Sequence, residues 1–199
     1  MSEDEFAKAL LSHERRKWQD PLKILAQLDL HKGMHIADLG CGPGYFTIPF
    51  AKSVGAKGIV YAIDSSQVML SYLDSNIERS KVERKIVRVF LSDITKTDIP
   101  SSSVDLVFLA NILHDISHRA KLFSEIRRIS KEGAKLVVVE WKKEDTGFGP
   151  EVGIRLGEHE TKQILKENGY VFRKIEAGPY HYGLSSSLFG KNERQSRNN

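Results

Sequence analysis

The chain has 199 residues, 40% of them hydrophobic and 28% charged, and its mean hydropathy of −0.34 excludes a disordered or fibrous protein. Its formal charge of +4 is modest and partly lies in the last nine residues, so composition predicts no DNA partner. No apolar run approaches the roughly 20 residues that a bilayer requires, the start is acidic, and the single cysteine fits a reducing compartment, so we expect a cytoplasmic protein with no membrane partner.

Two helical patterns, over residues 5–17 and 21–28, precede the first predicted strand. Asp20 is the expected N-cap of the second helix, with Pro21 at its first position. From about residue 34 onward, short β-branched runs alternate with helical patterns, as in a parallel sheet with helices on both faces. The predicted strands are 35–39, 58–63, 85–90, 104–109 and 134–140, and the predicted helices between them are 43–53, 66–78 and 119–130.

The pattern changes after the fifth strand. A glycine-rich stretch over residues 146–157 leads to a helix over 158–168 and then to two strands, 170–176 and 182–189, joined as an antiparallel hairpin. The predicted fold is therefore α/β, a Rossmann-like doubly wound sheet of seven strands, mostly parallel, with a C-terminal antiparallel hairpin. We expect N-terminal helices over residues 1–33, one domain over 34–190, and a disordered polar tail over 191–199.

A glycine loop carries the strongest functional signal. The sequence Asp-Leu-Gly-Cys-Gly-Pro-Gly runs from Asp38 to Gly44, where the first strand turns toward a helix. Gly40 and Gly42 allow a sharp turn and let a ligand lie against the main chain. Asp64 ends the second strand, where a carboxylate can accept hydrogen bonds from a ribose. A tight turn without any ligand is the alternative interpretation.

The residues of the loop favour a cationic nucleoside over a dinucleotide. Tyr45 stands where a dinucleotide fingerprint has its third glycine, and Pro43 removes an amide donor from the helix start. The carboxylate of Asp38 would repel a pyrophosphate and attract an ammonium or sulfonium group. A nicotinamide-dependent oxidoreductase is therefore a disfavoured alternative.

This loop resembles motif I of the class I S-adenosylmethionine-dependent methyltransferases, and residues 64–70, Asp-Ser-Ser-Gln-Val-Met-Leu, resemble the second motif of their ubiquinone/menaquinone-biosynthesis-like branch, of methyltransferase domain 11/25 type. The resemblance extends over about residues 18–191. It implies methyltransferase activity, S-adenosylmethionine as cofactor, and N-terminal helices that cap the site. The implied cofactor-binding residues are Asp38, Gly40, Gly42, Asp64, Ser65, Met69, Asp93, Ile94 and Asn111.

The resemblance also implies individual roles. Asp38 would lie near the methionine ammonium, Asp64 would bind the ribose hydroxyls, and Asp93 would accept from the adenine amine. Met69 would pack on the adenine, and Asn111 would line the cofactor. Asp93 has an alternative interpretation as the N-cap of a helix.

His114 is the candidate catalytic residue. It follows the fourth strand at the family's acceptor-facing position, where it could serve as a base or orient the acceptor, or could simply be a histidine at a helix start. His114, Asp115 and His118 resemble part of a zinc helix, but aspartate is shorter than the required glutamate and no third ligand is evident. No metal site is predicted.

Negative evidence favours a small-molecule methyl acceptor. The chain lacks an Asn/Asp-Pro-Pro-aromatic motif after the fourth strand, and Cys41 lies in the glycine loop rather than where a nucleophile would act on cytosine. A protein or RNA acceptor, or a non-catalytic methyltransferase-like subunit, remains an alternative. The candidate residues for the acceptor pocket are Arg15, Trp18, Glu140, Trp141, Arg155, His159, Tyr180 and His181.

Overall fold

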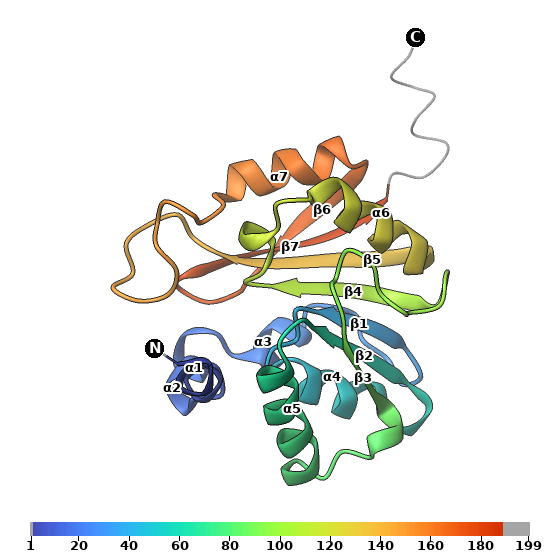
Figure 1. Ribbon diagram of the computed structural model, residues 1–199. Coiled ribbons are helices and arrows are strands. Elements are labelled where there is room, and N and C mark those ends of the chain that lie inside the picture. The colour runs from blue at the N-terminus through green and yellow to red at the C-terminus, as the bar shows by residue number, and fades with distance from the viewer. Residues whose placement is uncertain (1, 189–199) are drawn as a thin grey trace.

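Seven strands form one sheet in the order β3-β2-β1-β4-β5-β7-β6, in a computed structural model that describes residues 2–188 (Figure 1). The neighbours from β3 to β5 pair in parallel, whereas β5 with β7 and β7 with β6 pair antiparallel. The strands are β1 (His35–Leu39), β2 (Ile59–Asp64), β3 (Val87–Leu91), β4 (Val104–Ala110), β5 (Ser130–Trp141), β6 (Tyr170–Ile175) and β7 (His181–Leu188). The predicted seven-stranded fold with its C-terminal hairpin is confirmed.

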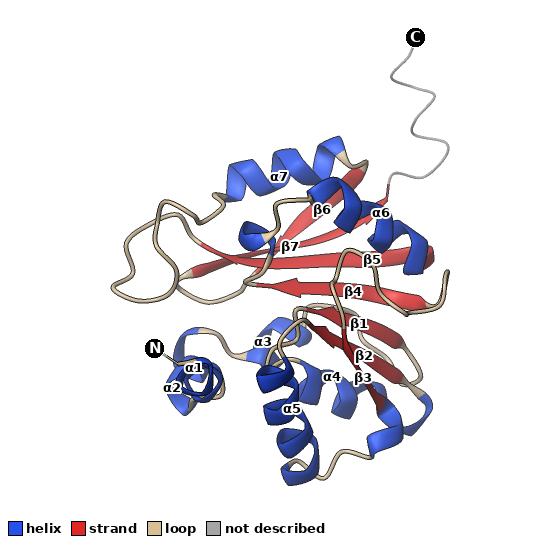
Figure 2. Cartoon of the chain, in the orientation of Figure 1, coloured by secondary structure: helices blue, strands red, loops and turns tan. Residues whose placement is uncertain are grey.

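Helices cover both faces of this sheet (Figure 2). The α-helices are α1 (Glu3–Leu10), α2 (His13–Trp18), α3 (Pro21–Leu25), α4 (Thr47–Val54), α5 (Gln67–Arg79), α6 (Arg119–Ile129) and α7 (Glu158–Glu167). Short 3₁₀ turns are η1 (Gly55–Lys57), η2 (Arg84–Ile86) and η3 (Leu113–Asp115). Helices α3, α4 and α5 pack into one hydrophobic cluster, and α6 and α7 pack into a second one.

The central strands explain why there are two clusters. Along β4, Leu106 and Phe108 join the cluster of α4, whereas Val107 and Leu109 join the cluster of α6, and all four are fully buried. Successive side chains of a strand point to opposite faces, so a continuous apolar run is expected where both faces are covered. The polar side chains that matter for function are therefore confined to the strand ends and the loops that follow them.

The N-terminal region differs from its prediction. The expected helix over residues 5–17 is divided into α1 and α2, because the side chain of Ser12 accepts from the amide of Arg15 and starts a new helix. Asp20 caps α3 as expected, although this helix ends at Leu25. Helices α1 and α2 lie at the edge of the sheet where the parallel strands end, as does the loop after β5 (Figure 1).

The start of β5 also differs. The sequence predicts a helix over residues 119–130 and a strand over 134–140, but α6 ends at Ile129 and the chain continues directly into β5 at Ser130, which pairs with Val104. A register shift between Val104 and Leu106 accommodates this extra length of strand. No helix within residues 2–188 is long and apolar enough to cross a membrane. The predicted disordered tail, 191–199, lies outside the described residues.

Candidate cofactor and acceptor site

The glycine loop leaves β1 with a sharp reversal that its glycines make possible. The amides of Gly40 and Cys41 both donate to the carbonyl of Ile63, at 2.8 and 3.0 Å, which ties the loop to the end of β2. Gly44 has a φ of 88°, and a Cβ there would lie 2.4 Å from Cδ1 of Leu73. The loop is therefore held close to α5 in a conformation that other residues rarely adopt.

Asp64 is fixed at the end of β2 by backbone donors on both of its oxygens. Oδ2 accepts from the amide of Gly42 at 2.8 Å, and Oδ1 accepts from the amide of Ser66 at 2.9 Å. A carboxylate offers about four lone-pair sites, so the half-buried side chain keeps capacity for two more donors. This is the arrangement that a pair of ribose hydroxyls requires.

Asp38 lies beneath the same loop and is only 2% exposed. Its Oδ2 accepts from the hydroxyl of Thr47 at 2.6 Å. Burial raises the pKa of this carboxyl group to about 7; the hydroxyl of Thr47 and the positive charge of Arg15 favour the charged form, and the neighbouring charge of Asp64 opposes it. A cationic ligand group beside Asp38 would favour the carboxylate form.

Met69, Ser65, Asp93 and Ile94 follow strands β2 and β3 as predicted. Met69 is buried at the start of α5, where its amide donates to the hydroxyl of Ser66, and Ser65 is exposed. Asp93 is exposed and its Oδ1 accepts from the amide of Thr95 at 2.7 Å, which lowers the pKa of its carboxyl group. Residues 93–96 form a turn, so the alternative interpretation of Asp93 as a helix N-cap is wrong. Ile94 packs in the cluster of α6.

Asn111 occupies a strained position directly after β4. Its φ of 57° is left-handed, which is uncommon for residues other than glycine. Its side-chain Nδ2 donates to Oε1 of Gln19 at 3.4 Å, whereas Oδ1 is buried and has no hydrogen-bond partner within the described residues. A buried amide oxygen without a donor is a place where a ligand could supply one.

His114 is held by Glu140 from the end of β5. The distance from Nδ1 of His114 to Oε2 of Glu140 is 2.8 Å, and both side chains are buried. Burial lowers the pKa of His114, but the hydrogen bond and negative charge of Glu140 outweigh it, with help from Asp115, so the pKa lies above its usual value. Oε1 of Glu140 also accepts from the amides of Leu113 and His114, at 2.7 and 3.3 Å. Glu140 thus shapes turn η3 and orients the imidazole ring.

Five aromatic rings gather where β5 ends and β7 begins, from four separate segments of the chain. Trp18 stacks on His181 with the ring centroids 5.5 Å apart, and Trp141 lies 4.1 Å from the same ring. Phe148 and Tyr180 complete this aromatic cluster, with centroids 5.1 Å apart. His181 is buried with no hydrogen bond to either ring nitrogen among the described residues, and burial lowers its pKa to about 3, so the ring is neutral.

Sequence reasoning named four members of this cluster but missed Phe148. The residue lies in the loop after β5, where no periodic pattern signals its contacts. Arg155 is a candidate residue of the acceptor pocket. Its guanidinium donates to four backbone carbonyls and the hydroxyl of Thr146, so it also holds the loop together. His159 is exposed on α7.

Helix α1 lies against α5 and the glycine loop. Oγ of Ser66 donates to Glu3 at 2.6 Å, and the hydroxyl of Tyr72 donates to Asp4 at 3.0 Å, which connects α1 to α5. Cδ1 of Leu10 would lie 3.8 Å from a Cβ at Gly42. The N-terminal helices therefore border the glycine loop, the position that a cap over the site would take.

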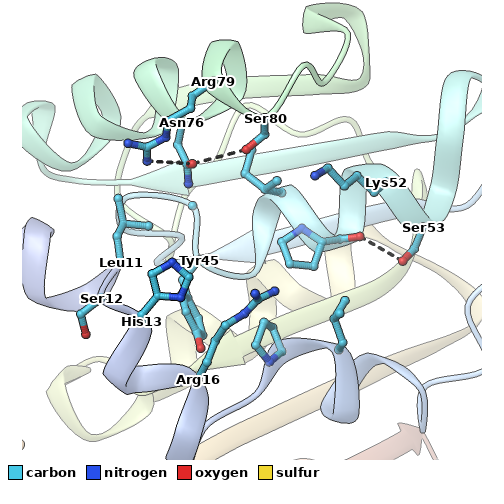
Figure 3. Close-up of a pocket in the computed structure, with 15 residues that line it drawn as sticks. Leu11, Ser12, His13, Arg16, Tyr45, Lys52, Ser53, Asn76, Arg79 and Ser80 are labelled. Atoms are coloured by element: carbon cyan, nitrogen blue, oxygen red, sulfur yellow. Dashed lines mark hydrogen bonds between the residues drawn. The ribbon is translucent and has the colours of Figure 1, made fainter.

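A cavity of about 530 Å³ lies between α2, α4 and α5 (Figure 3). Its cationic lining residues are Arg16, Lys52 and Arg79, and Gly44 of the glycine loop and Tyr45 also line it. It is lined by none of the nine predicted cofactor-binding residues. The cavity is thus distinct from the predicted site.

No three histidine, cysteine, aspartate or glutamate side chains gather as a metal site among residues 2–188. His118 is exposed before α6, whereas His114 is engaged with Glu140.

The chain matches a known protein family over its central part: residues 37–138 match the methyltransferase domain family. A demethylmenaquinone methyltransferase from Lactiplantibacillus plantarum is 32% identical over 65% of this chain and 54% of its own length. A ubiquinone/menaquinone biosynthesis C-methyltransferase, UbiE, from Burkholderia vietnamiensis is 29% identical over 60% of this chain and 48% of its own. The chain thus spans about half the length of these curated relatives.

A solved structure covers much more of the chain. The crystal structure of a SAM-dependent methyltransferase from Aquifex aeolicus superposes with a TM-score of 0.86 and is 32% identical. The alignment covers 94% of this chain and 98% of that one.

Proposed function

The chain belongs to the methyltransferase domain family, among its S-adenosylmethionine-dependent, UbiE-like members, and from this premise we propose that it methylates a small planar molecule. The observation that carries the proposal is the joint placement of Asp64 and the glycine loop. Asp64 is fixed by the loop's own amide and retains free lone pairs at the end of β2. In α/β sheets, ligands bind at this edge of the strands.

The residues present fit the adenosyl cofactor. We assign Asp64 to the ribose hydroxyls, Gly40 and Gly42 to contact with the ligand, and Asp38 to the cationic methionine end. Met69 supplies an apolar surface for the adenine, and Asp93 keeps one carboxylate oxygen for the adenine amine. Ser65, Ile94 and Asn111 border the same site. The unpartnered Oδ1 of Asn111 supports this assignment, because a buried acceptor in a native protein is normally satisfied.

The aromatic cluster supports a planar acceptor. Its rings gather where β5 ends and β7 begins, and flat apolar surfaces of this kind bind flat apolar ligands through dispersion and stacking. The relatives named for menaquinone and ubiquinone biosynthesis are consistent with such an acceptor. A quinone-like ring is the example that we propose to test first.

His114 is proposed to take the proton that a hydroxyl or carbon acid releases on methylation. The bound cofactor supplies an electrophilic methyl group, so the chain's main tasks are to position the acceptor and exclude water. Because Glu140 accepts from Nδ1, the neutral imidazole carries its lone pair on Nε2. That nitrogen can accept a proton while Glu140 stabilises the resulting imidazolium.

The experiment is a transfer assay with S-adenosylmethionine labelled in its methyl group. Hydroxyquinones and phenols are supplied in parallel with bulk RNA and protein, and the label is followed into each fraction. We expect label in the small planar compounds and a slower turnover for His114→Gln with unchanged cofactor affinity. Label confined to RNA or protein, or no transfer despite cofactor binding, would contradict the proposal.

A further inference from the structure

The cavity between α2, α4 and α5 has the charge of an anion-binding site. Three of its lining side chains are cationic, Arg16 from α2, Lys52 from α4 and Arg79 from α5 (Figure 3). Of the 15 described residues that line the cavity, none is aspartate or glutamate. An anion in the cavity would therefore be attracted by side chains of three helices and repelled by no lining carboxylate.

The three cations also lack acidic partners. Within residues 2–188, none of Arg16, Lys52 and Arg79 forms an ion pair. By contrast, Arg84, which follows α5, pairs with Asp74 at 2.9 Å. Each of the three cations is exposed, so each one alone would hold an anion weakly in water. Binding therefore depends on the three side chains acting together on one ligand.

Polar neighbours orient part of this lining. Nη2 of Arg79 donates to Oδ1 of Asn76 at 3.3 Å, and Nδ2 of Asn76 donates to the carbonyl of Pro43 at 3.3 Å. Asn76 is buried, so its amide gives the guanidinium a fixed support. The hydroxyl of Ser12 accepts from the amide of Arg15 at 3.4 Å, which leaves the hydroxyl proton for a ligand. The cavity thus offers neutral donors beside its charges.

The remaining lining is largely apolar. The volume of about 530 Å³ falls in the range of small-molecule sites, roughly 300–1,000 Å³. Leu22, at 56%, is the most exposed large hydrophobic side chain among the described residues. A hydrated inorganic ion would leave this apolar surface uncovered, so a ligand with an apolar body fits better. The apolar residues of the lining are Leu11, Pro21, Leu22, Ile48 and Pro49.

We propose that this cavity is a second ligand site, which binds a small organic phosphate. The phosphate group lies among Arg16, Lys52 and Arg79, and the apolar body covers Leu22 and Ile48. Guanidinium groups bind phosphate oxygens through paired N–H donors, and a phosphate monoester carries a charge of about −1.5 to −2 at pH 7, which three cations can balance. The site is separate from the proposed cofactor site, because none of the residues assigned to the adenosyl ligand lines the cavity.

The test is calorimetric titration with three probes. Hexyl phosphate has both the phosphate and an apolar body, inorganic phosphate lacks the body, and hexanol lacks the phosphate. We expect one hexyl phosphate site per chain, with an affinity about 10-fold higher than that of inorganic phosphate, a factor that burial of about two CH₂ groups supplies. Hexanol should not bind measurably. The hexyl phosphate site should remain when the chain is saturated with S-adenosylhomocysteine, because the two sites are separate.

Two double variants test the placement of the site. Arg16→Gln/Lys52→Gln removes two cations of the cavity and should weaken hexyl phosphate by at least about 10-fold, the range for hydrogen bonds to charged groups. Lys8→Gln/Lys57→Gln removes the same net charge from exposed positions outside the cavity and should bind as the native chain does. If the first variant does not fold, Lys52→Gln alone, on an exposed side chain, replaces it.

The outcomes separate this site from the proposed function. Absence of hexyl phosphate binding, equal losses in the two double variants, or hexanol binding as tight as hexyl phosphate would overturn the second site. Equal affinities for inorganic and hexyl phosphate would overturn the role of the apolar wall, and displacement of hexyl phosphate by S-adenosylhomocysteine would place the probe in the cofactor site instead. Failure of S-adenosylhomocysteine to bind, with hexyl phosphate bound as expected, would contradict the proposed function alone.

Discussion

The strands β2 and β5 each carry a carboxylate near their carboxyl end, and the two carboxylates differ in burial and in hydrogen bonding. Each strand places a carboxylate at the sheet edge, and each carboxylate accepts a backbone amide from the loop that follows a neighbouring strand, β1 for Asp64 and β4 for Glu140. Asp64 is half-buried and retains lone pairs, whereas Glu140 is fully buried and also accepts from the ring of His114. Burial and the number of donors therefore decide whether such a carboxylate is available to a ligand or is part of the scaffold.

Replacing the buried carboxylate should have the largest effect on stability. In Glu140→Ala, His114 and the amides of η3 lose their acceptor, and breaking a buried pair costs about 3–5 kcal/mol. Urea unfolding measures this loss. Glu83→Ala removes an exposed carboxylate paired with Lys85 and should cost less than about 1 kcal/mol. Equal losses in the two variants would contradict the scaffold role of Glu140.

Replacing the available carboxylate should chiefly affect the ligand. Asp64→Ala should weaken binding of S-adenosylhomocysteine by about 1.5–3 kcal/mol, because charge-assisted hydrogen bonds to the ribose are lost. Calorimetry with the purified variant measures the change. The control is Asp74→Ala. Asp74 is an exposed residue of α5 that pairs with Arg84, and this variant should bind S-adenosylhomocysteine as the native chain does. Unchanged affinity in Asp64→Ala would refute the ribose assignment.

The turn between β6 and β7 depends on a close approach between distant segments. A Cβ at Gly178 would lie 2.0 Å from the carbonyl oxygen of Trp18, so Gly178→Ala must displace the aromatic cluster. Gly169→Ala is a matched control, because its φ of 82° is also left-handed but no atom lies within 4 Å of its Cβ. We expect Gly178→Ala to lower the free energy of unfolding, measured by thermal unfolding, by about 1–3 kcal/mol more than Gly169→Ala does. Gly178→Ala should also alter the near-ultraviolet circular dichroism spectrum. Equal losses of unfolding free energy in the two variants would contradict the close approach of Gly178 to Trp18.

The smallest expected effect is a pH dependence from His114. Its folded pKa is raised, so its stabilisation is complete below the unfolded value of about 6.5 and is lost as the pH rises through the folded value. The difference in unfolding free energy between the native chain and His114→Gln should therefore be largest near pH 6 and should shrink at higher pH. A difference that grows as the pH rises would contradict the pairing with Glu140.

The sequence predicted most of the sheet because parallel strands have local signatures. The first strand was predicted over residues 35–39, as in the structure, and the others within a few residues, since β-branched runs bounded by turns mark them. The break at Ser12 carried a recognisable N-cap signal that was not used. The extension of β5 depends on pairing with Val104, which no local pattern records.

The residues of the candidate site also differ in how well the sequence alone predicts their placement. The glycine loop and Asp64 lie in short motifs, so their placement could be predicted from the sequence. Gln19 and Phe148 act through contacts with residues distant in the chain, such as Asn111 and Trp18, and only the folded structure brings these together. Arg15 was noticed, but its hydrogen bonds to Gln19 become visible only in the folded structure.

Calorimetric titration of the native chain with S-adenosylhomocysteine and, separately, with NAD tests the assignment of the glycine loop most directly. We expect micromolar binding of the adenosyl ligand and none of the dinucleotide, because Pro43 and Asp38 make the loop a poor binding site for a pyrophosphate. Tighter binding of NAD, or binding of neither compound, would contradict the assignment of the glycine loop to an adenosyl cofactor.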